Sequence, residues 1–458
     1  MTDKFIFGSK VKINAPAALD CALMRELWHG FCFSASEAEF SVIDGTAIVI
    51  GTPSPVSTNG HGCALSVTKD GIYVAANDIP SLIDGYCALL SLVTPISLEN
   101  GSEQLCVPLG LTYIDRPIAR KTVHICVFPE TSFFFLKRMI RLAGFLRYTH
   151  LVIEFWGTFR FKCLPELAWR DRSFTAEELK PIIDEAKAFG MEIIPDFNHL
   201  GHASASRHIY GKHVVLDQNP RLATLFSGDG WAWNLENEKV RPLLKQIRKE
   251  LCDLCGDGEF FHLGCDECYT YEGDREKMSL AANHLAAICN ETLSEGRRPI
   301  IWGDMFLTKE QVGYSKTEPY ECNCRDEMIA KELLSKLPKD TVIADWQYNV
   351  ACSPWRSTEY FMANGFDTFV CPWESSKNVA SAIETVEKLG AFGLMETTWH
   401  HLPKMISELL HVNKLLHNSS DNSTNAVLKT ETAALLRKLL PANNYEESGW
   451  ARSQLEFI

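Results

Sequence analysis

The chain of 458 residues is predicted to be an α/β protein, a (β/α)8 TIM barrel preceded by a small α+β domain. From Thr122 onward, eight short β-rich runs alternate with longer helical segments, which indicates a parallel sheet with crossover helices. The stretch from Arg120 to His417 has the length of such a barrel, which typically takes ~250 residues or more. Residues before 115 show alternating, turn-rich runs instead.

The eight expected strands cover residues 122–128, 150–155, 191–197, 260–264, 299–304, 341–346, 367–373 and 393–399. Helical segments lie between them, and in one of these Thr175 and Glu178 have the spacing of a capping box, with Gly190 as the stop signal. An open doubly wound sheet is the alternative, but no glycine-rich phosphate turn follows the first run. The pattern therefore favours a closed barrel.

The amino-terminal part has a different pattern. Two alternating runs are joined by Lys69-Asp70-Gly71, which is a hairpin signal, and a helical stretch follows at 79–93. The segment 112–120 is a candidate linker into the barrel. We divide the chain into a small α+β domain, a catalytic barrel and a carboxyl-terminal helical extension, with the boundaries 1–115, 116–417 and 418–458.

The composition, with 46% hydrophobic and 22% charged residues, is typical of a folded protein with a sizeable core. A formal net charge of −13 argues against nucleic acid or an anionic membrane as a partner, because such binders concentrate Lys and Arg. The amino-terminal segment has no uninterrupted apolar stretch, and nowhere do ~18 apolar residues run together. We therefore expect a cytoplasmic protein without a membrane partner, and the sequence leaves a homodimer open.

The 16 cysteines are scattered along a long chain, so we expect reduced thiols packed as small hydrophobic groups. Three pairs have spacings that a zinc site could use, namely Cys252/Cys255, Cys265/Cys268 and Cys322/Cys324. The first pair lies in an amphipathic run, where residues three apart share a helix face. We expect neither a metal nor a cofactor.

Polar and aromatic side chains gather where the expected strands end, which in this fold is the face that carries the active site. They are Glu154 and Trp156, Asp196 and Asn198, Gly201 and His202, Asp266 and Glu267, Trp302 and Asp304, Asp345 and Trp346 with Tyr348, Trp373 and Glu374, and Trp399 with His400 and His401. A flat indole ring can cover the C–H face of a sugar or an acetamido methyl group. Each tryptophan could instead cap the barrel core.

Asp266 and Glu267 are adjacent at the end of the fourth expected strand. Adjacent side chains project in different directions, so the pair does not fit the two facing carboxylates of an ordinary retaining or inverting glycosidase. A mechanism in which the substrate's own amide is the nucleophile explains the adjacency, because one carboxylate orients the amide while the other protonates the leaving oxygen. A magnesium site and a surface acidic pair are the simpler alternatives.

The segment FFHLGCDECY resembles the His-x-Gly-Gly-Asp-Glu signature of the family 20 glycoside hydrolases, the β-N-acetylhexosaminidases. Three further segments, IIPDFNHLGHASA, PIIWGDMF and GLMETTW, resemble the family's motifs on strands three, five and eight. The hairpin and helix at 62–96 are similar to the small domain that precedes this family's barrel. The resemblance therefore spans nearly the whole chain.

The resemblance implies roles for four residues. Glu267 matches the general acid that protonates the glycosidic oxygen and later activates water, and Asp266 matches the residue that holds the 2-acetamido N–H. His202 matches the histidine that hydrogen-bonds the acid. Glu154 stands where many members carry Asp, and we expect it to hold the other ring nitrogen of His202.

The resemblance also implies a binding pocket for the acetamido group. Trp302, Trp346 and Trp399 are its expected walls, and Tyr348 is the hydroxyl expected to donate to the carbonyl oxygen. Trp373 on strand seven is the alternative in the neighbourhood of Tyr348.

Several positions depart from the family pattern. Cys265 replaces the usual second glycine, and its small side chain is tolerable there. Arg120 leads into the first strand without the usual Asp, so its expected role in sugar binding is insecure. After Trp399, His400 and His401 replace the usual acidic ligand of the outer hydroxyls. His262 is expected to orient the turn after the fourth strand.

The expected activity is that of an exo-acting β-N-acetylhexosaminidase that removes terminal β-linked GlcNAc or GalNAc with retention, through an oxazolinium intermediate formed by the substrate. The expected partner is an amino-sugar glycoside substrate. The segment HLGCDECY looks closer to the intracellular hexosaminidase D-like branch, which is associated with galactosaminides.

Three alternatives stay open. The chain could be a non-catalytic amino-sugar-binding or regulatory protein on the same fold, although an intact Asp266-Glu267 pair argues against this. It could be a metal-dependent hydrolase with Asp266, Glu267, His202 and His262 as ligands. A conventional enzymatic nucleophile could also stand at one of four strand ends, at Glu154, Asp304, Asp345 or Glu374.

Overall fold

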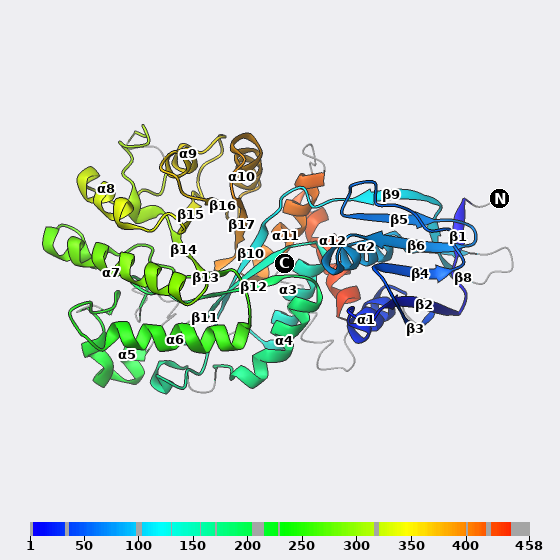
Figure 1. Cartoon of the computed structure of the whole chain (residues 1–458), viewed down its shortest axis with the longest axis horizontal. Coiled ribbons are helices and arrows are strands. Elements are labelled where there is room, and N and C mark those ends of the chain that lie inside the picture. Colours follow the sequence, from blue (N-terminus) through cyan, green and yellow to red (C-terminus); the bar gives the residue numbers. More distant parts are fainter. Residues whose placement is uncertain are drawn as a thin grey trace.

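The computed structural model describes residues 3–32, 36–97, 103–129, 131–155, 157–169, 172–203, 215–227, 230–315, 320–399, 402–417 and 423–440. In this part of the chain, eight parallel strands form a closed barrel, and nine preceding strands form two further sheets (Figure 1). The predicted TIM barrel with a small α+β domain before it is therefore confirmed.

The barrel strands follow one another in sequence order around the barrel. They are β10 (Lys121–Val127), β11 (His150–Phe155), β12 (Glu192–Asp196), β13 (Phe260–His262), β14 (Arg298–Trp302), β15 (Val342–Trp346), β16 (Thr368–Cys371) and β17 (Gly393–Thr397). The barrel closes where β17 pairs with β10, with Met395 opposite Thr122. All eight expected strands are present. Glu154, Trp302 and Trp346 lie in the last pairs of the ladder, whereas Glu267, Asp304 and Trp399 follow the ends of their strands.

Helices surround the barrel, and the predicted capping box at the start of one of them is present. Thr175 Oγ1 accepts the Glu178 N–H at 3.2 Å, and Glu178 Oε2 accepts the Thr175 N–H at 2.8 Å. The helices are α3 (Phe133–Phe145), α4 (Ala176–Ala188), α5 (Val215–Gln218), α6 (Val240–Cys255), α7 (Arg275–Ser294), α8 (Glu327–Lys336), α9 (Arg356–Ala363), α10 (Ser376–Leu389), α11 (Leu402–His417) and α12 (Asn425–Leu439).

The amino-terminal sheets pack beside helices α1 (Cys21–Cys32) and α2 (Ile79–Leu92). One sheet has the strand order β3-β2-β4-β6-β5-β9, and the other has the order β1-β8-β7. Their strands are β1 (Lys4–Ile6), β2 (Lys10–Pro16), β3 (Glu37–Ile43), β4 (Ala47–Gly51), β5 (Cys63–Val67), β6 (Gly71–Ala76), β7 (Thr94–Ser97), β8 (Glu103–Pro108) and β9 (Gly110–Ile114).

The predicted hairpin is the antiparallel pair β5 and β6, in which Val67 pairs with Ile72. The predicted linker is too long, because its first three residues belong to β9, where Ile114 pairs with Cys63 of β5. Residues 112–114 therefore belong to the edge strand of the six-stranded sheet and not to the linker. The segment that connects this sheet to β10 is 115–120.

A buried arginine joins three parts of the molecule. Arg141 on α3 is 1% exposed, and its guanidinium bonds Glu26 of α1 and Glu185 of α4. It also donates to the Leu439 carbonyl at the end of α12, at 2.8 Å. The Arg141 guanidinium thus connects the amino-terminal region, the barrel helices and the last described helix. In agreement with this, α12 lies against both α1 and α3 (Figure 1).

The barrel interior contains an apolar cluster, and buried polar and charged groups lie towards the carboxyl ends of several strands. The apolar cluster consists of Val152, Ile194, Phe260, Ile300, Trp302, Val342, Ala344, Trp346, Phe369, Cys371 and Met395. Buried charged and polar groups replace such residues towards the strand ends, including Glu154, Asp196 and His262. Among the described helices, none has the length and hydropathy that a membrane span requires.

Candidate active site

Unusual backbone conformations are concentrated at the carboxyl ends of the barrel strands. Seven described non-glycine residues have left-handed φ angles, and five of them lie at these ends. The five are His202, Cys265, Glu267, Glu374 and Trp399, with φ of 52°, 74°, 48°, 59° and 44°. Such conformations cost free energy and are typical of functional sites, where the surrounding structure holds them in place.

Glu267 is held at four of its atoms. Its N–H donates to Asp304 Oδ2 at 2.9 Å, and its carbonyl accepts the indole N–H of Trp231 at 2.7 Å. On the side chain, the Tyr269 hydroxyl donates to Oε1 at 3.1 Å, and His202 Nε2 lies 3.2 Å from Oε2. Both the main chain and the carboxyl group are therefore fixed, which is what a proton donor of defined direction requires.

Asp266 lies deeper than Glu267, and His202 connects the two. The Asp266 side chain is 9% exposed and that of Glu267 is 31% exposed. His202 Nε2 lies 3.3 Å from Asp266 Oδ2. The close approach of the two loops depends on Gly201, because a Cβ atom there would lie 2.3 Å from the Asp266 carbonyl oxygen. The structure thus brings the three residues of the expected acid machinery together.

Five aromatic residues form one continuous group beside these carboxylates. The rings of Trp302 and Trp399 are 5.5 Å apart, and the Trp399 indole N–H donates to the Tyr348 oxygen at 2.6 Å. Tyr348 lies 4.9 Å from the ring of Trp346 and 5.2 Å from that of Trp373. Both proposed neighbours, Tyr348 and Trp373, therefore belong to the same group. All five residues of the expected acetamido pocket are in contact.

Asp304 links Glu267 to this aromatic group. Its Oδ2 accepts the Glu267 N–H, and its Oδ1 accepts the Trp346 indole N–H at 3.3 Å. The side chain is buried, and burial together with the charge of Asp266 raises the pKa of Asp304 above its usual range. The sequence had placed Asp304 only among the strand-end carboxylates.

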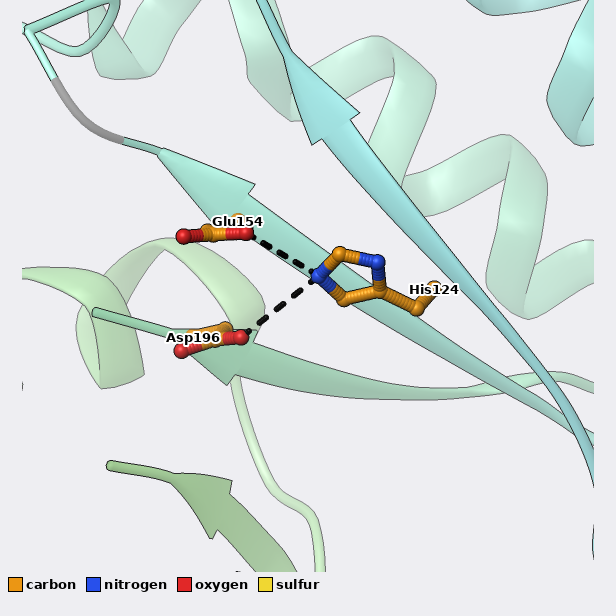
Figure 2. A group of neighbouring side chains, drawn as sticks. All are labelled: His124, Glu154 and Asp196. Carbon is orange, nitrogen blue, oxygen red and sulfur yellow. Dashed lines mark hydrogen bonds and ion pairs between the residues drawn. The ribbon is translucent and has the colours of Figure 1, made fainter. Parts of the chain in front are cut away.

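A buried network of one histidine and two carboxylates lies across β10, β11 and β12 (Figure 2). His124 Nε2 lies 3.0 Å from Glu154 Oε2 and 3.7 Å from Asp196 Oδ2, and all three side chains are at most 1% exposed. Glu154 Oε1 accepts an N–H of Asn198 at 2.9 Å. The expected bond from Glu154 to His202 is replaced by these contacts, because the His124 ring reaches Glu154 from the neighbouring strand.

The ligand atoms of His124, Glu154 and Asp196 all lie within 4.8 Å of one another, so this group could hold a metal ion. A bond from the His124 ring to Glu154 accounts for the same arrangement without an ion. Among the described residues, Asp266, Glu267, His202 and His262 do not converge in this way. The metal-dependent hydrolase with that ligand set therefore lacks a geometric basis.

His262 is the last residue of β13 and contacts the turn that follows it. It is fully buried, and its Nδ1 accepts the Gly264 N–H at 3.1 Å in the turn that leads to Asp266. Its ring lies 4.5 Å from that of Trp302. Burial lowers the pKa of His262 to about 4, so the ring is neutral near pH 7 and contacts the underside of the aromatic group.

Arg120 does not belong to this site. It precedes β10, and its guanidinium lies 3.9 Å from the ring of Phe392 and 3.9 Å from Glu259, at the amino-terminal ends of the strands. The strand direction explains the correction, because a residue before a barrel strand lies at the face opposite the active site. His400 and His401, which the sequence placed near the outer hydroxyls, lie outside the described residues.

Sequence reasoning missed three contributors, His124, Trp231 and Tyr269. His124 is a polar residue inside the otherwise apolar run 122–128, and this interruption was a usable signal. Tyr269 is two residues from the acid, within the resembling motif itself. Trp231 comes from a distant loop, and nothing in its local sequence indicates its bond to Glu267.

The Asp266–His202–Glu267 group and the aromatic residues lie at the carboxyl ends of the barrel strands, the face that carries the active site in this fold. Residues 158–376 match the model described as the glycosyl hydrolase family 20 catalytic domain. The match begins after β11 and ends where α10 begins, so most of the barrel is similar to the catalytic domain of family 20.

A curated relative, a β-N-acetylhexosaminidase from Cellulomonas fimi, is 22% identical over 143 residues, which is 31% of this chain and 27% of the relative. The chain thus matches about a quarter of that relative's length.

Solved structures resemble the fold over nearly the whole chain. A family 20 exo-β-N-acetylglucosaminidase from Vibrio harveyi, in complex with N-acetylglucosamine, has a TM-score of 0.66 at 14% identity and covers 97% of this chain and 76% of its own. A β-N-acetylhexosaminidase from Bacteroides fragilis has a TM-score of 0.64 at 15% identity, covering 99% and 94%. One from Streptomyces coelicolor has a TM-score of 0.66 at 12% identity, covering 97% and 95%.

Proposed function

We propose that this protein is an exo-acting β-N-acetylhexosaminidase that hydrolyses terminal β-linked GlcNAc or GalNAc with retention of configuration. One observation carries the proposal: His202 Nε2 lies within 3.3 Å of both the buried Asp266 and the more exposed Glu267. The two carboxylates thus differ in environment while they share one histidine. Different environments for two adjacent carboxylates support two different roles.

In the first step, the Glu267 carboxyl gives its proton to the glycosidic oxygen as the bond from the anomeric carbon to that oxygen breaks. The acetamido carbonyl oxygen of the substrate forms a bond to the anomeric carbon from the opposite face. The N–H of the amide is held by Asp266, whose negative charge stabilises the cationic oxazolinium. Trp302, Trp346 and Trp399 enclose the acetamido group, and the Tyr348 hydroxyl donates to its oxygen.

In the second step, Glu267 takes a proton from a water molecule, and the water oxygen attacks the anomeric carbon. The bond to the acetamido oxygen breaks, and the amide regains its neutral form. Two inversions give net retention, and no sugar becomes attached to the protein. This double role requires that the same carboxyl group faces the same oxygen position in both steps. The contacts that hold Glu267 in place support it, and they come from Trp231, Asp304, Tyr269 and His202.

The contacts of the other strand-end carboxylates argue against a protein nucleophile at three positions. Asp345 accepts from the Ser357 hydroxyl at 2.7 Å and the Thr358 hydroxyl at 2.6 Å, so its oxygens are engaged within the protein. Glu154 is bonded to His124 and Asn198, and Asp304 to Glu267 and Trp346. Glu374 is half-buried and stays as the alternative that experiment has to address.

The test is a kinetic comparison of aryl β-glycosides of GlcNAc, GalNAc and glucose. The proposal expects turnover of one or both amino sugars and almost none of the glucoside, because a 2-hydroxyl cannot replace the acetamido nucleophile. Comparison of the two amino sugars determines the preference between GlcNAc and GalNAc, which the sequence leaves open, and a preference for GalNAc would fit the hexosaminidase D-like branch. Binding of the free sugars without turnover of any glycoside would instead indicate the non-catalytic binding protein.

A further inference from the structure

The Asp304 carboxylate is the meeting point of three N–H donors from separate segments of the chain. Oδ2 accepts the Glu267 main-chain N–H at 2.9 Å and the Asn323 side-chain N–H at 2.8 Å. Oδ1 accepts the Trp346 indole N–H at 3.3 Å. Asp304 is 2% exposed, so these bonds form in a medium of low dielectric constant, where they are stronger than in water.

The position of Asp304 is itself fixed. It is the first residue of a short 3-10 helix (Asp304–Phe306) that follows β14 directly. Its carbonyl accepts the Asn323 main-chain N–H at 2.7 Å, so both ends of the residue are tied to the loop before α8. A carboxylate held in this way can impose a position on the groups that donate to it.

Glu267 needs such an imposed position, because its φ of 48° lies in a region that a non-glycine residue rarely adopts. Its main-chain bonds resist relaxation towards an ordinary conformation: the N–H donates to Asp304, and the carbonyl accepts the Trp231 indole N–H and the Tyr269 main-chain N–H. A displacement of ~1 Å in a reacting group can cost ~10²-fold in rate. The direction of the acid therefore depends on the Asp304 bond.

We propose that Asp304 is a positioning residue that ties the acid Glu267 to the pocket residue Trp346. One buried carboxylate thereby sets both the wall that receives the acetamido group and the direction of proton delivery. This inference rests on the proposed role of Glu267 as the acid. Asp304 itself touches neither the substrate nor the reacting atoms in this arrangement.

A merely structural role makes a different prediction from a positioning role. Loss of a buried structural carboxylate lowers stability and reduces activity on all substrates alike. Loss of acid positioning reduces turnover mainly for substrates with poor leaving groups, because activated leaving groups depart without full proton transfer. The slope of log(kcat/KM) against the pKa of the leaving group therefore separates the two roles.

The test compares Asp304→Asn with wild type on a series of aryl and alkyl β-glycosides of the preferred amino sugar. The amide replaces an acceptor oxygen by an NH2 group that faces N–H donors, so it weakens the hold on Glu267. We expect kcat/KM for the poorest leaving group to fall by a factor about tenfold larger than that for the best one, which is within the range of general acid catalysis. Equal losses for all leaving groups would overturn the proposal.

The matched control is Asp345→Asn. Asp345 is also a buried strand-end carboxylate with several donors, Ser357, Thr358 and Gln347, but none of its bonds reaches Glu267. We expect this variant to lose stability and to keep the wild-type dependence on the leaving group. The same change of slope in Asp345→Asn would show that any buried carboxylate here produces it, and this result also overturns the proposal.

A second variant keeps the test decisive if Asp304→Asn does not fold. Asn323→Ala removes one donor to the oxygen that holds the Glu267 N–H, and it leaves the Asp304 charge in place. We expect a smaller change of slope with the same sign, and no change would contradict the proposal. Glu267→Gln serves as the reference: if it shows no dependence on the leaving group, the proposed function fails rather than the role of Asp304.

Discussion

The indole nitrogen of Trp399 lies 2.6 Å from the phenolic oxygen of Tyr348, and the indole N–H donates to it. Because this bond occupies a lone pair of the phenolic oxygen, the hydroxyl hydrogen is directed elsewhere. The rings of Trp346 and Trp373 also contact Tyr348, at 4.9 and 5.2 Å between ring centroids, and restrict its orientation. Tyr348 is thus held in place within the aromatic group, as its proposed role as a donor to the acetamido oxygen requires.

We expect Tyr348→Phe to lower kcat/KM by about 10- to 100-fold, because one donor to a developing charge is typically worth ~1.5–3 kcal/mol. The fold should be unchanged, since the ring stays in place. Steady-state kinetics on an aryl glycoside of the preferred sugar measures the effect. Tyr360→Phe is the control, because the Tyr360 hydroxyl bonds Gln311 on the outer side of the barrel. A loss below twofold in Tyr348→Phe would remove Tyr348 from this role.

Glu267→Gln should lower turnover of poor leaving groups by ~10²–10⁴-fold and that of activated aryl glycosides much less. The amide cannot donate a carboxylic proton, whereas its size and contacts with Tyr269 and His202 are nearly conserved. Kinetics with leaving groups of different pKa provide the measurement. A uniform loss across the series would contradict the assignment of Glu267 as the acid.

Asp266→Asn should weaken the binding of a thiazoline mimic of the oxazolinium by a large factor while it leaves the fold intact. The amide keeps the size of the side chain but removes the charge that opposes the cationic intermediate. Inhibition constants of the thiazoline for wild type and variant measure this effect. If the two constants agree, Asp266 does not stabilise the intermediate.

Progressive fluorination of the substrate's acetyl group should slow turnover, because fluorine withdraws electrons from the carbonyl oxygen that attacks the anomeric carbon. The variant Glu374→Gln should retain activity, since the proposed mechanism needs no protein nucleophile. Mass spectrometry of enzyme quenched during turnover is the direct check. A glycosylated carboxylate on Glu374 would establish the conventional mechanism instead.

Glu396 on β17 should make stability depend on pH. It is fully buried, and neither carboxyl oxygen has a hydrogen-bond partner in the described part of the chain. Burial raises the pKa of Glu396 well above its usual range, and nearby Glu408 adds to the effect. The folded protein therefore keeps a proton that the unfolded chain releases above its ordinary pKa of ~4.3.

The stability that this proton contributes is fully present below the unfolded pKa and is lost as pH rises towards the folded pKa. Because Gln does not ionise, Glu396→Gln should gain free energy of unfolding relative to wild type as pH rises above ~4.3, by up to ~1.4 kcal/mol per pH unit until the folded pKa is reached. Urea unfolding of both proteins at pH 5 and pH 7 measures the difference. A difference that does not change with pH would contradict a protonated Glu396.

The barrel could be predicted because its strands are buried on both faces and therefore form continuous apolar runs. The run 150–155 coincides with β11. Short edge strands carry a weaker signal: β9 is mostly exposed, so its residues resembled a linker. Pairing with β5, which the sequence does not reveal, makes it a strand.

The proximity of Asp266, Glu267 and His202 could be predicted because the two carboxylates are adjacent and His202 follows a glycine in a segment that resembles a family motif. The partner of Glu154 could not, because contacts across neighbouring strands depend on the stagger of the barrel. This stagger brings His124, rather than His202, to the Glu154 carboxylate. The bond from the Trp231 indole to the Glu267 carbonyl could not be predicted either, because Trp231 lies in a loop without a periodic sequence pattern.

Several residues at the carboxyl ends of the barrel strands have left-handed φ angles, and this limits how the protein can be redesigned. Glycine adopts those backbone angles without the steric cost that Cys265, Glu267 and Trp399 incur. A design that optimised folding stability alone would favour glycine at these positions, and it would remove Glu267, the proposed proton donor, and Trp399, a proposed wall of the acetamido pocket. Replacement of Glu267 or Trp399 by glycine would therefore relieve backbone strain at the expense of the proposed chemistry.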